Sequence, residues 1–172
     1  GNDNIRTELF RPANCVGAIT VSAVDRIGFP SSYSNGGSNV LLAAPGGQRR
    51  GDAAQPSLFS PVNSLAIKPP LPGGRFMSET DGVLSTVFSS TPNSGQRLPT
   101  YRFDEGTSMA APHAAGVLAL MKAIHPALTE QQVRSLAAAG RLSNDDPYVS
   151  GPDIFTGFGI IDAFKAVSEA RA

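Results

Sequence analysis

The chain has 172 residues, of which 41% are hydrophobic and 16% charged, and its 14 lysines and arginines balance its 14 aspartates and glutamates. This length and apolar content are sufficient for one globular domain with a sizeable core. Zero net charge, without a basic cluster beyond Arg49 and Arg50, argues against nucleic acid or an anionic membrane surface as a partner, and no apolar run reaches the roughly 18 residues of a membrane-spanning helix.

The first part of the chain predicts a turn followed by two strands. Residues 1–4 read GNDN, a composition typical of turns. Residues 18–24 alternate β-branched and small side chains and predict a buried strand, and residues 40–44 predict a second one. Because helical segments follow later in the chain, these strands indicate an α/β fold with a mostly parallel sheet.

A proline- and glycine-rich stretch then covers residues 47–82. Its composition predicts an irregular loop on the surface, and a loop of this length in a compact domain is usually functional or mobile. We expect that its deletion leaves the turnover of a short peptide largely intact.

The central feature is EGTSMAAPHAAGVLALM at residues 105–121, which predicts a long helix without a useful polar face, enclosed within a domain. Gly106 before it and Pro112 near its start place Ser108 at the helix N-terminus. Unpaired backbone N–H groups and the positive end of the helix dipole favour a developing anion there, and the Ser108 N–H could be one donor to it. The alternative is that Ser108 merely caps the helix.

The two histidines are poor candidates for a base that activates Ser108. A serine nucleophile needs a base within about 2.6 to 3.2 Å. On a helix, His113 lies about 140° around the axis from Ser108, and His125 lies about 25 Å along it. We therefore expect His113 to be packed and bonded to a neighbour, His125 to be solvated at a helix end, and any catalytic histidine to lie outside these residues.

Two further helices are predicted downstream. Thr129 and Gln132 form a capping-box pattern that opens a helix, with Val133, Leu136 and Ala137 on its inner face, and Gly140 ends it. Asp162 is placed to interact with the N-terminus of a last helix.

The string GTSMAAPH at residues 106–113 matches, position for position, the nucleophile motif of the subtilisin-like serine proteases. PANC before ITVSAV, SSYSNGG, AAPG and GFGIIDAFKAV resemble further segments of that family. The resemblance implies part of a subtilisin-like three-layer α/β fold whose buried central helix carries Ser108 as the nucleophile. It also implies a serine endopeptidase, secreted or periplasmic, that acts on a protein or peptide substrate.

The resemblance also implies roles for residues away from the motif. In the family, the half of the domain that carries the serine begins with a similar Gly-Asn pair, so Asn2 would give its side-chain amide to the oxyanion hole. Gly1, Asp3 and Thr107 would contact the substrate. Phe10 would floor and shorten the specificity pocket, two residues before Pro12, whose counterpart commonly follows a cis peptide bond.

Two family segments are missing from the sequence: the D-T/S-G segment with the aspartate and the H-G-T segment with the histidine. We therefore interpret residues 1–172 as the C-terminal portion of a catalytic domain, with about 47–82 as an inserted loop, and the missing N-terminal half as a partner. By the same resemblance, 82–87 is a short strand and 89–106 a variable loop. Cys15 is either a small apolar residue or half of a disulfide with an upstream cysteine. No metal site is expected here, although the complete enzyme could bind calcium.

Two alternatives remain open at this stage. In the first, the chain is a catalytically inactive subtilisin-like scaffold that serves as a peptide-binding or regulatory module. In the second, these residues fold alone, or as a swapped dimer, as an inert fragment.

Overall fold

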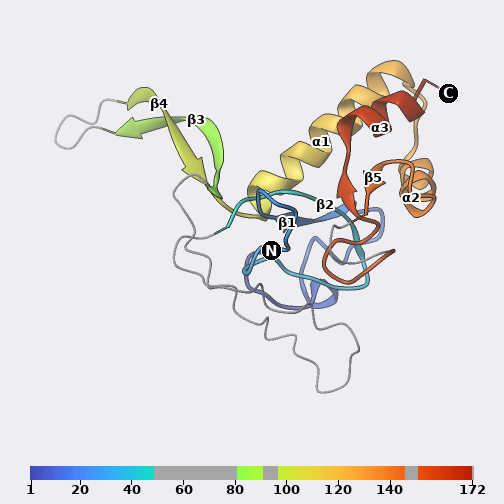
Figure 1. Ribbon diagram of the computed structural model, residues 1–172, viewed down its shortest axis with the longest axis horizontal. Helices are drawn as coiled ribbons and strands as arrows, with labels where there is room; N and C mark the ends of the chain where they lie inside the picture. Colours follow the sequence, from blue (N-terminus) through green and yellow to red (C-terminus); the bar gives the residue numbers. More distant parts are fainter. Residues whose placement is uncertain (49–80, 91–96, 146–150, 172) are drawn as a thin grey trace.

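The computed structural model describes residues 1–48, 81–90, 97–145 and 151–171. Figure 1 shows a sheet accompanied by helices and a hairpin that projects away from them. The elements in chain order are η1 (Thr7–Leu9, a 3-10 helix), β1 (Thr20–Val24), β2 (Val40–Pro45), β3 (Val83–Ser90), β4 (Arg97–Asp104), α1 (Thr107–Ile124), α2 (Glu130–Ala138), β5 (Ser143–Asn144), β6 (Ile160–Ile161) and α3 (Ala163–Glu169).

The main sheet has the strand order β1-β2-β6-β5. β1 pairs with β2 in parallel, β2 pairs with β6 in parallel, and β5 runs antiparallel to β6. In β2, the side chains of Leu42, Ala43 and Ala44 are completely buried, as expected for an inner strand of a parallel sheet. The predicted α/β class with a mostly parallel sheet is confirmed, and both predicted strands are present within one or two residues of their expected ends.

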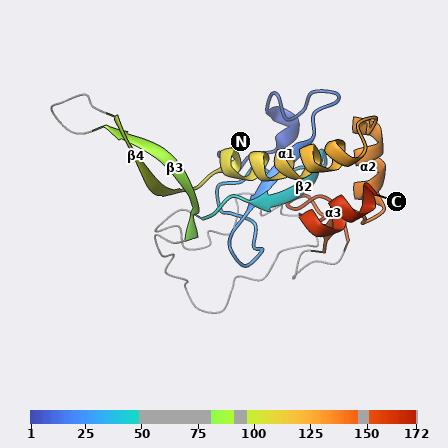
Figure 2. The same cartoon turned by 90° about the horizontal axis from the view of Figure 1, so that it is seen from above.

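Helix α1 runs across the sheet and contacts β1, β2 and α3 (Figure 2). Its buried stripe consists of Ala110, Ala114 and Met121, which recur at helical spacing on one face. The opposite face is also apolar, yet 56% of Leu120 and 40% of Ile124 are exposed. The sequence predicts a helix enclosed within a whole domain; in the described residues the sheet and α3 cover one face of α1, and the other face is exposed.

Strands β3 and β4 form an antiparallel hairpin that projects near the N-terminal end of α1 (Figure 1). The strand expected at 82–87 is present and continues to Ser90. The prediction of a loop over 89–106 is wrong, because residues 97–104 form β4. Pro99 lies within β4, and proline is tolerated at the open edge of a two-stranded ribbon. Large apolar side chains on this hairpin are exposed, notably Phe88 and Tyr101.

The two C-terminal helices begin as the sequence predicts. In α2, the Thr129 N–H donates to Gln132 Oε1 at 2.8 Å and the Gln132 N–H donates to Thr129 Oγ1 at 3.3 Å, which completes the capping box. In α3, Asp162 accepts the Lys165 N–H at 2.9 Å, and this bond is the main cause that lowers the pKa of the Asp162 carboxyl. The inner face of α2 packs Val133 and Ala137 into the core beside β2 and α1.

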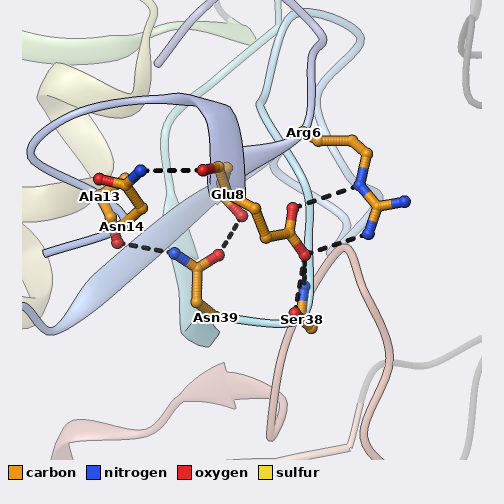
Figure 3. A network of polar contacts seen from close by, with 7 residues as sticks. Arg6, Glu8, Ala13, Asn14, Ser38 and Asn39 are labelled. Atoms are coloured by element: carbon orange, nitrogen blue, oxygen red, sulfur yellow. Dashed lines mark hydrogen bonds and ion pairs between the residues drawn. The ribbon is translucent and has the colours of Figure 1, made fainter. Parts of the chain in front are cut away.

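Polar contacts tie η1 to the loop before β2 (Figure 3). Glu8 Oε1 accepts from the Arg6 guanidinium at 3.3 Å and from the Ser38 N–H at 2.8 Å and hydroxyl at 2.7 Å. The Thr7 hydroxyl donates to Asn39 in the same loop. The hydrogen bond from Arg6 is the main cause that lowers the pKa of Glu8 to about 2.

The proposed insertion at about 47–82 falls mostly outside the described residues, which stop at Gln48 and resume at Asp81. The Gln48 N–H donates to the Asp81 carbonyl at 3.2 Å, so the two described ends of this stretch meet. An insertion with adjacent ends is compatible with an unchanged surrounding fold, and its identity as an insertion stays a prediction.

Candidate active site

Ser108 is the second residue of α1 and is exposed. The N-cap is Gly106, which has no side chain with which to cap the first turn. The alternative that Ser108 serves as a helix cap is therefore not supported, because its hydroxyl makes no hydrogen bond to the backbone of that turn. The side chain is presented at the positive end of an 18-residue helix, where developing negative charge is favoured.

Neither histidine contacts Ser108 among the described residues. His113 is exposed, and its Nδ1 lies 2.7 Å from the Met109 carbonyl of the same helix. The predicted bond to a neighbour is present, whereas the predicted packing of His113 is wrong, because it lies on the uncovered face of α1. His125 is the exposed C-cap residue of α1, as expected.

Asn2 lies beside the start of α1, although it is distant in sequence. Its Oδ1 accepts from the Thr107 N–H at 2.9 Å and from the Thr107 hydroxyl at 2.8 Å. A backbone N–H can only donate, so this contact identifies which end of the amide is the oxygen. The Asn2 Nδ2 group consequently points its N–H bonds elsewhere, as a donor in an oxyanion hole must.

Gly106 leaves space where two donors converge. A Cβ built on Gly106 would lie 3.1 Å from Asn2 Nδ2 and 3.6 Å from the Ser108 main-chain nitrogen. The φ of Gly106 is +151°, a conformation that favours glycine. Because this residue has no side chain, the place between the two donors is open.

The other predicted substrate-binding residues are Gly1, Asp3, Phe10 and Thr107. Thr107 is 9% exposed, and its hydroxyl also accepts from the Gly1 main-chain nitrogen at 2.9 Å, so its side chain is directed toward the Asn2 loop. The Phe10 ring lies beside Gly1, since its Cε1 is 3.1 Å from the Cβ position built there. Asp3 is exposed.

The Arg11–Pro12 peptide bond is cis, as the resemblance implies for Pro12. Cys15 is exposed and unpaired within the described residues, so it is not a buried apolar residue there.

Sequence reasoning missed two buried residues behind the site, Tyr33 and Asn35. The Tyr33 hydroxyl donates to the Gly46 carbonyl at 2.7 Å, and the same carbonyl accepts the Gly106 N–H at 2.9 Å. The segment around them was noted only for its resemblance. A buried amide and a buried phenol in a glycine-containing loop are the signal that could have drawn attention to it, because buried polar groups require partners.

Within the described ranges, no three histidine, cysteine, aspartate or glutamate side chains gather closely enough to hold a metal ion. In the same ranges, no helix combines the length and the apolar character needed to cross a membrane.

Comparison with protein families gives a match to the subtilase family (Peptidase_S8) over residues 1–149. An extracellular protease of Xanthomonas campestris pv. campestris is 30% identical over 171 residues, which cover 99% of this chain and 23% of that protein. A subtilisin of Bacillus pumilus is 29% identical over 166 residues, which cover 96% of this chain and 42% of that protein.

Solved structures give the same result. A protease from Pseudoalteromonas arctica superposes with a TM-score of 0.69 at 34% identity, over 99% of this chain and 41% of that one. Fervidolysin of Fervidobacterium pennivorans, described as a keratinolytic enzyme related to subtilisin, superposes with a TM-score of 0.61 at 25% identity, over 92% of this chain and 20% of that one. The chain thus spans less than half the length of each of these four proteins.

Proposed function

The chain belongs to the subtilase family, and on that premise we propose that it supplies the nucleophile and the oxyanion hole of a serine endopeptidase. Ser108 attacks the carbonyl carbon of the scissile peptide bond. The carbonyl oxygen becomes an oxyanion that accepts hydrogen bonds from the Ser108 N–H and from Asn2 Nδ2. Loss of the amine and attack by water on the acyl-enzyme then release the products and regenerate Ser108.

The observation that carries this proposal is the convergence of two donors at Gly106. An atom at the Cβ position of Gly106 would be 3.1 Å from Asn2 Nδ2 and 3.6 Å from the Ser108 nitrogen. The Asn2 amide is held in the donating orientation by two hydrogen bonds from Thr107 to its oxygen. A preorganised pair of donors next to an exposed serine is the arrangement that stabilises the tetrahedral intermediate of acyl transfer.

We propose that the histidine and aspartate of the triad come from an upstream portion of the protein that packs on α1. Two features support this. The exposed face of α1 between Ala115 and Ile124 is apolar except for Lys122, and β1 is an edge strand of the described sheet. Exposed apolar faces and open strand edges favour association with another polypeptide. On this proposal the chain alone is inactive.

The proposed substrate is a protein or peptide, and Phe10 sets the preference for the residue before the scissile bond. The Phe10 ring lies against Gly1, next to the oxyanion donor Asn2. A bulky ring there shortens the pocket, so small side chains are favoured at this substrate position. We propose a secreted or periplasmic location, by analogy with extracellular relatives. Calcium, if bound, is held by residues of the upstream portion.

The alternative function is that of an inactive, peptide-binding scaffold, in which the upstream portion lacks the histidine or the aspartate. The exposure of His113 and its bond within its own helix favour neither function. The two functions differ in the reactivity of Ser108.

A fluorophosphonate serine-hydrolase probe tests the proposal. We expect rapid labelling of Ser108 in the protein that contains the upstream portion, and none in the chain alone. Ser108→Ala should remove the label, whereas His113→Gln, which alters the nearest histidine in sequence, should retain it. A folded, complete protein that does not react would favour the inactive scaffold. Labelling that persists in Ser108→Ala would refute the assignment of the nucleophile.

A further inference from the structure

The loop that carries Asn2 is fixed by one buried residue, Asn35, which is 2% exposed. The main-chain N–H of Asn35 donates to the Gly1 carbonyl at 3.0 Å. Its side-chain Oδ1 accepts from the Asp3 N–H at 3.0 Å and from the Ile5 N–H at 3.2 Å. The peptide units before and after Asn2 therefore both depend on Asn35.

The backbone of this loop is shaped around the Asn35 oxygen. The two N–H groups that converge on it belong to Asp3 and Ile5, and the residue between them, Asn4, has a φ of +51°. A left-handed residue turns neighbouring N–H groups toward a common acceptor, and asparagine tolerates this conformation better than most residues. The Asn4 N–H in turn donates to the Tyr33 carbonyl at 2.9 Å.

The same buried segment also reaches the serine side of the site. The Tyr33 hydroxyl donates to the Gly46 carbonyl, which accepts the Gly106 N–H at 2.9 Å. Residues 33–35 thus contact the loop that carries Asn2 directly and the start of α1 through Gly46.

We propose that Asn35 is a positioning residue for catalysis: by fixing both peptide units that flank Asn2, it aligns Asn2 Nδ2 with the Ser108 N–H. This inference rests on the proposed function, in which Asn2 is an oxyanion donor. Asn35 acts through Asn2 and touches neither the substrate nor the reacting atoms.

Stability of the fold alone does not explain why position 35 is an asparagine. The Asn35 Nδ2 group is buried and has no hydrogen-bond partner among the described residues. A buried donor without a partner costs about 1 to 3 kcal/mol. Stability alone therefore gives little reason for this amide, whereas its oxygen is the acceptor that the Asn2 loop requires.

A double-mutant cycle tests the inference in the protein that contains the upstream portion. Asn2→Ala, Asn35→Ala and the double variant are assayed on a short peptide p-nitroanilide. We expect Asn35→Ala to lower kcat about ten- to a hundredfold, because a small displacement of a catalytic group is costly. KM should stay within about twofold, since the oxyanion forms only after binding. In the Asn2→Ala background, Asn35→Ala should cost less than about twofold, since its effect passes through Asn2.

Asn39→Ala is the matched control, because it removes a side chain in the same region that donates to the Ala13 carbonyl at 2.7 Å and accepts from the Thr7 hydroxyl, with no hydrogen bond to residues 1–5. It should leave kcat within about twofold. If Asn35→Ala does not fold, as judged by circular dichroism, the smaller change Asn35→Ser enters the same cycle with the same expectations.

If the losses in kcat of the two single variants multiply in the double variant, the inference is overturned and the proposed function stands. The same holds if Asn35→Ala changes KM alone. An active parent whose Asn2→Ala variant keeps full kcat would also overturn it, since no donor would then need positioning. A folded parent that neither hydrolyses the peptide nor reacts with the fluorophosphonate would refute the proposed function, and this inference with it.

Discussion

Replacing Thr107 with valine tests how the Asn2 amide is held. The change keeps the shape of the side chain and the Thr107 N–H bond to Asn2 Oδ1 at 2.9 Å. It removes the hydroxyl, which donates to Asn2 Oδ1 at 2.8 Å and accepts from the Gly1 nitrogen at 2.9 Å, and only the bond to Asn2 acts directly on the amide. One hydrogen bond contributes about 0.5 to 1.5 kcal/mol net. At about 1.4 kcal/mol for each factor of ten, loss of this bond in the transition state lowers kcat roughly two- to tenfold.

This loss should be much smaller than that of Asn2→Ala, which removes the donor itself and should cost about a hundred- to a thousandfold in kcat. The assay is steady-state hydrolysis of a peptide p-nitroanilide by the complete protein. Thr107→Ser keeps the hydroxyl and is the control, with kcat expected near that of the parent. A Thr107→Val loss as large as that of Asn2→Ala, an equal loss in Thr107→Ser, or a change confined to KM would refute this account of the site.

Three further predictions concern Gly106, Phe10 and Glu8. Gly106→Ala places a methyl group 3.1 Å from Asn2 Nδ2 at a φ of +151°, so kcat should fall more than about a hundredfold. Gly140→Ala is the control, because Gly140 also has a positive φ, +66°, but no atom lies within 4 Å of the new Cβ; its Tm should fall while kcat stays unchanged. Phe10→Gly should raise the ratio of kcat/KM for a phenylalanyl p-nitroanilide to kcat/KM for an alanyl p-nitroanilide by at least about tenfold. An unchanged ratio would show that Phe10 does not line the specificity pocket. The pKa of Glu8 falls from 4.5 to about 2 on folding, mainly through the hydrogen bond from Arg6. The Glu8 carboxylate therefore stabilises the fold fully above about pH 4.5, and this stabilisation is lost as the pH falls toward 2. The Tm difference between the parent and Glu8→Gln should shrink over that range, and a constant difference would contradict the prediction.

Local patterns predicted the elements whose causes are local. The start of α1 follows from Gly106 and Pro112, and the start of α2 follows from the Thr129 and Gln132 pair, because caps and helix starts depend on neighbours within one turn. β1 and β2 were predicted for the same reason, since buried parallel strands have a simple apolar pattern.

Features that depend on distant partners could not be predicted in this way. The strand β4 contains Pro99 and is exposed on most of its length, so it lacks the apolar signal of a core strand. The exposure of one face of α1 depends on which segments cover it and not on its own sequence. The contacts of Asn35 with Gly1, Asp3 and Ile5 cross 30 or more residues of sequence, and no local spacing encodes them.

Because the two proposed oxyanion donors lie far apart in the sequence, we expect catalysis to be sensitive to partial unfolding. Asn2 meets Thr107 across 105 residues, and the segment that carries it is held mainly by polar bonds, with 77% of Leu9 and 38% of Ile5 exposed. Detachment of such a segment exposes little apolar surface to water, so it requires less free energy than global unfolding. We expect heat or mild denaturant to abolish turnover while the core around Met121 and Leu142 is still intact. Loss of enzymatic activity would then report the detachment of residues 1–9, and spectroscopic melting would report the unfolding of the core.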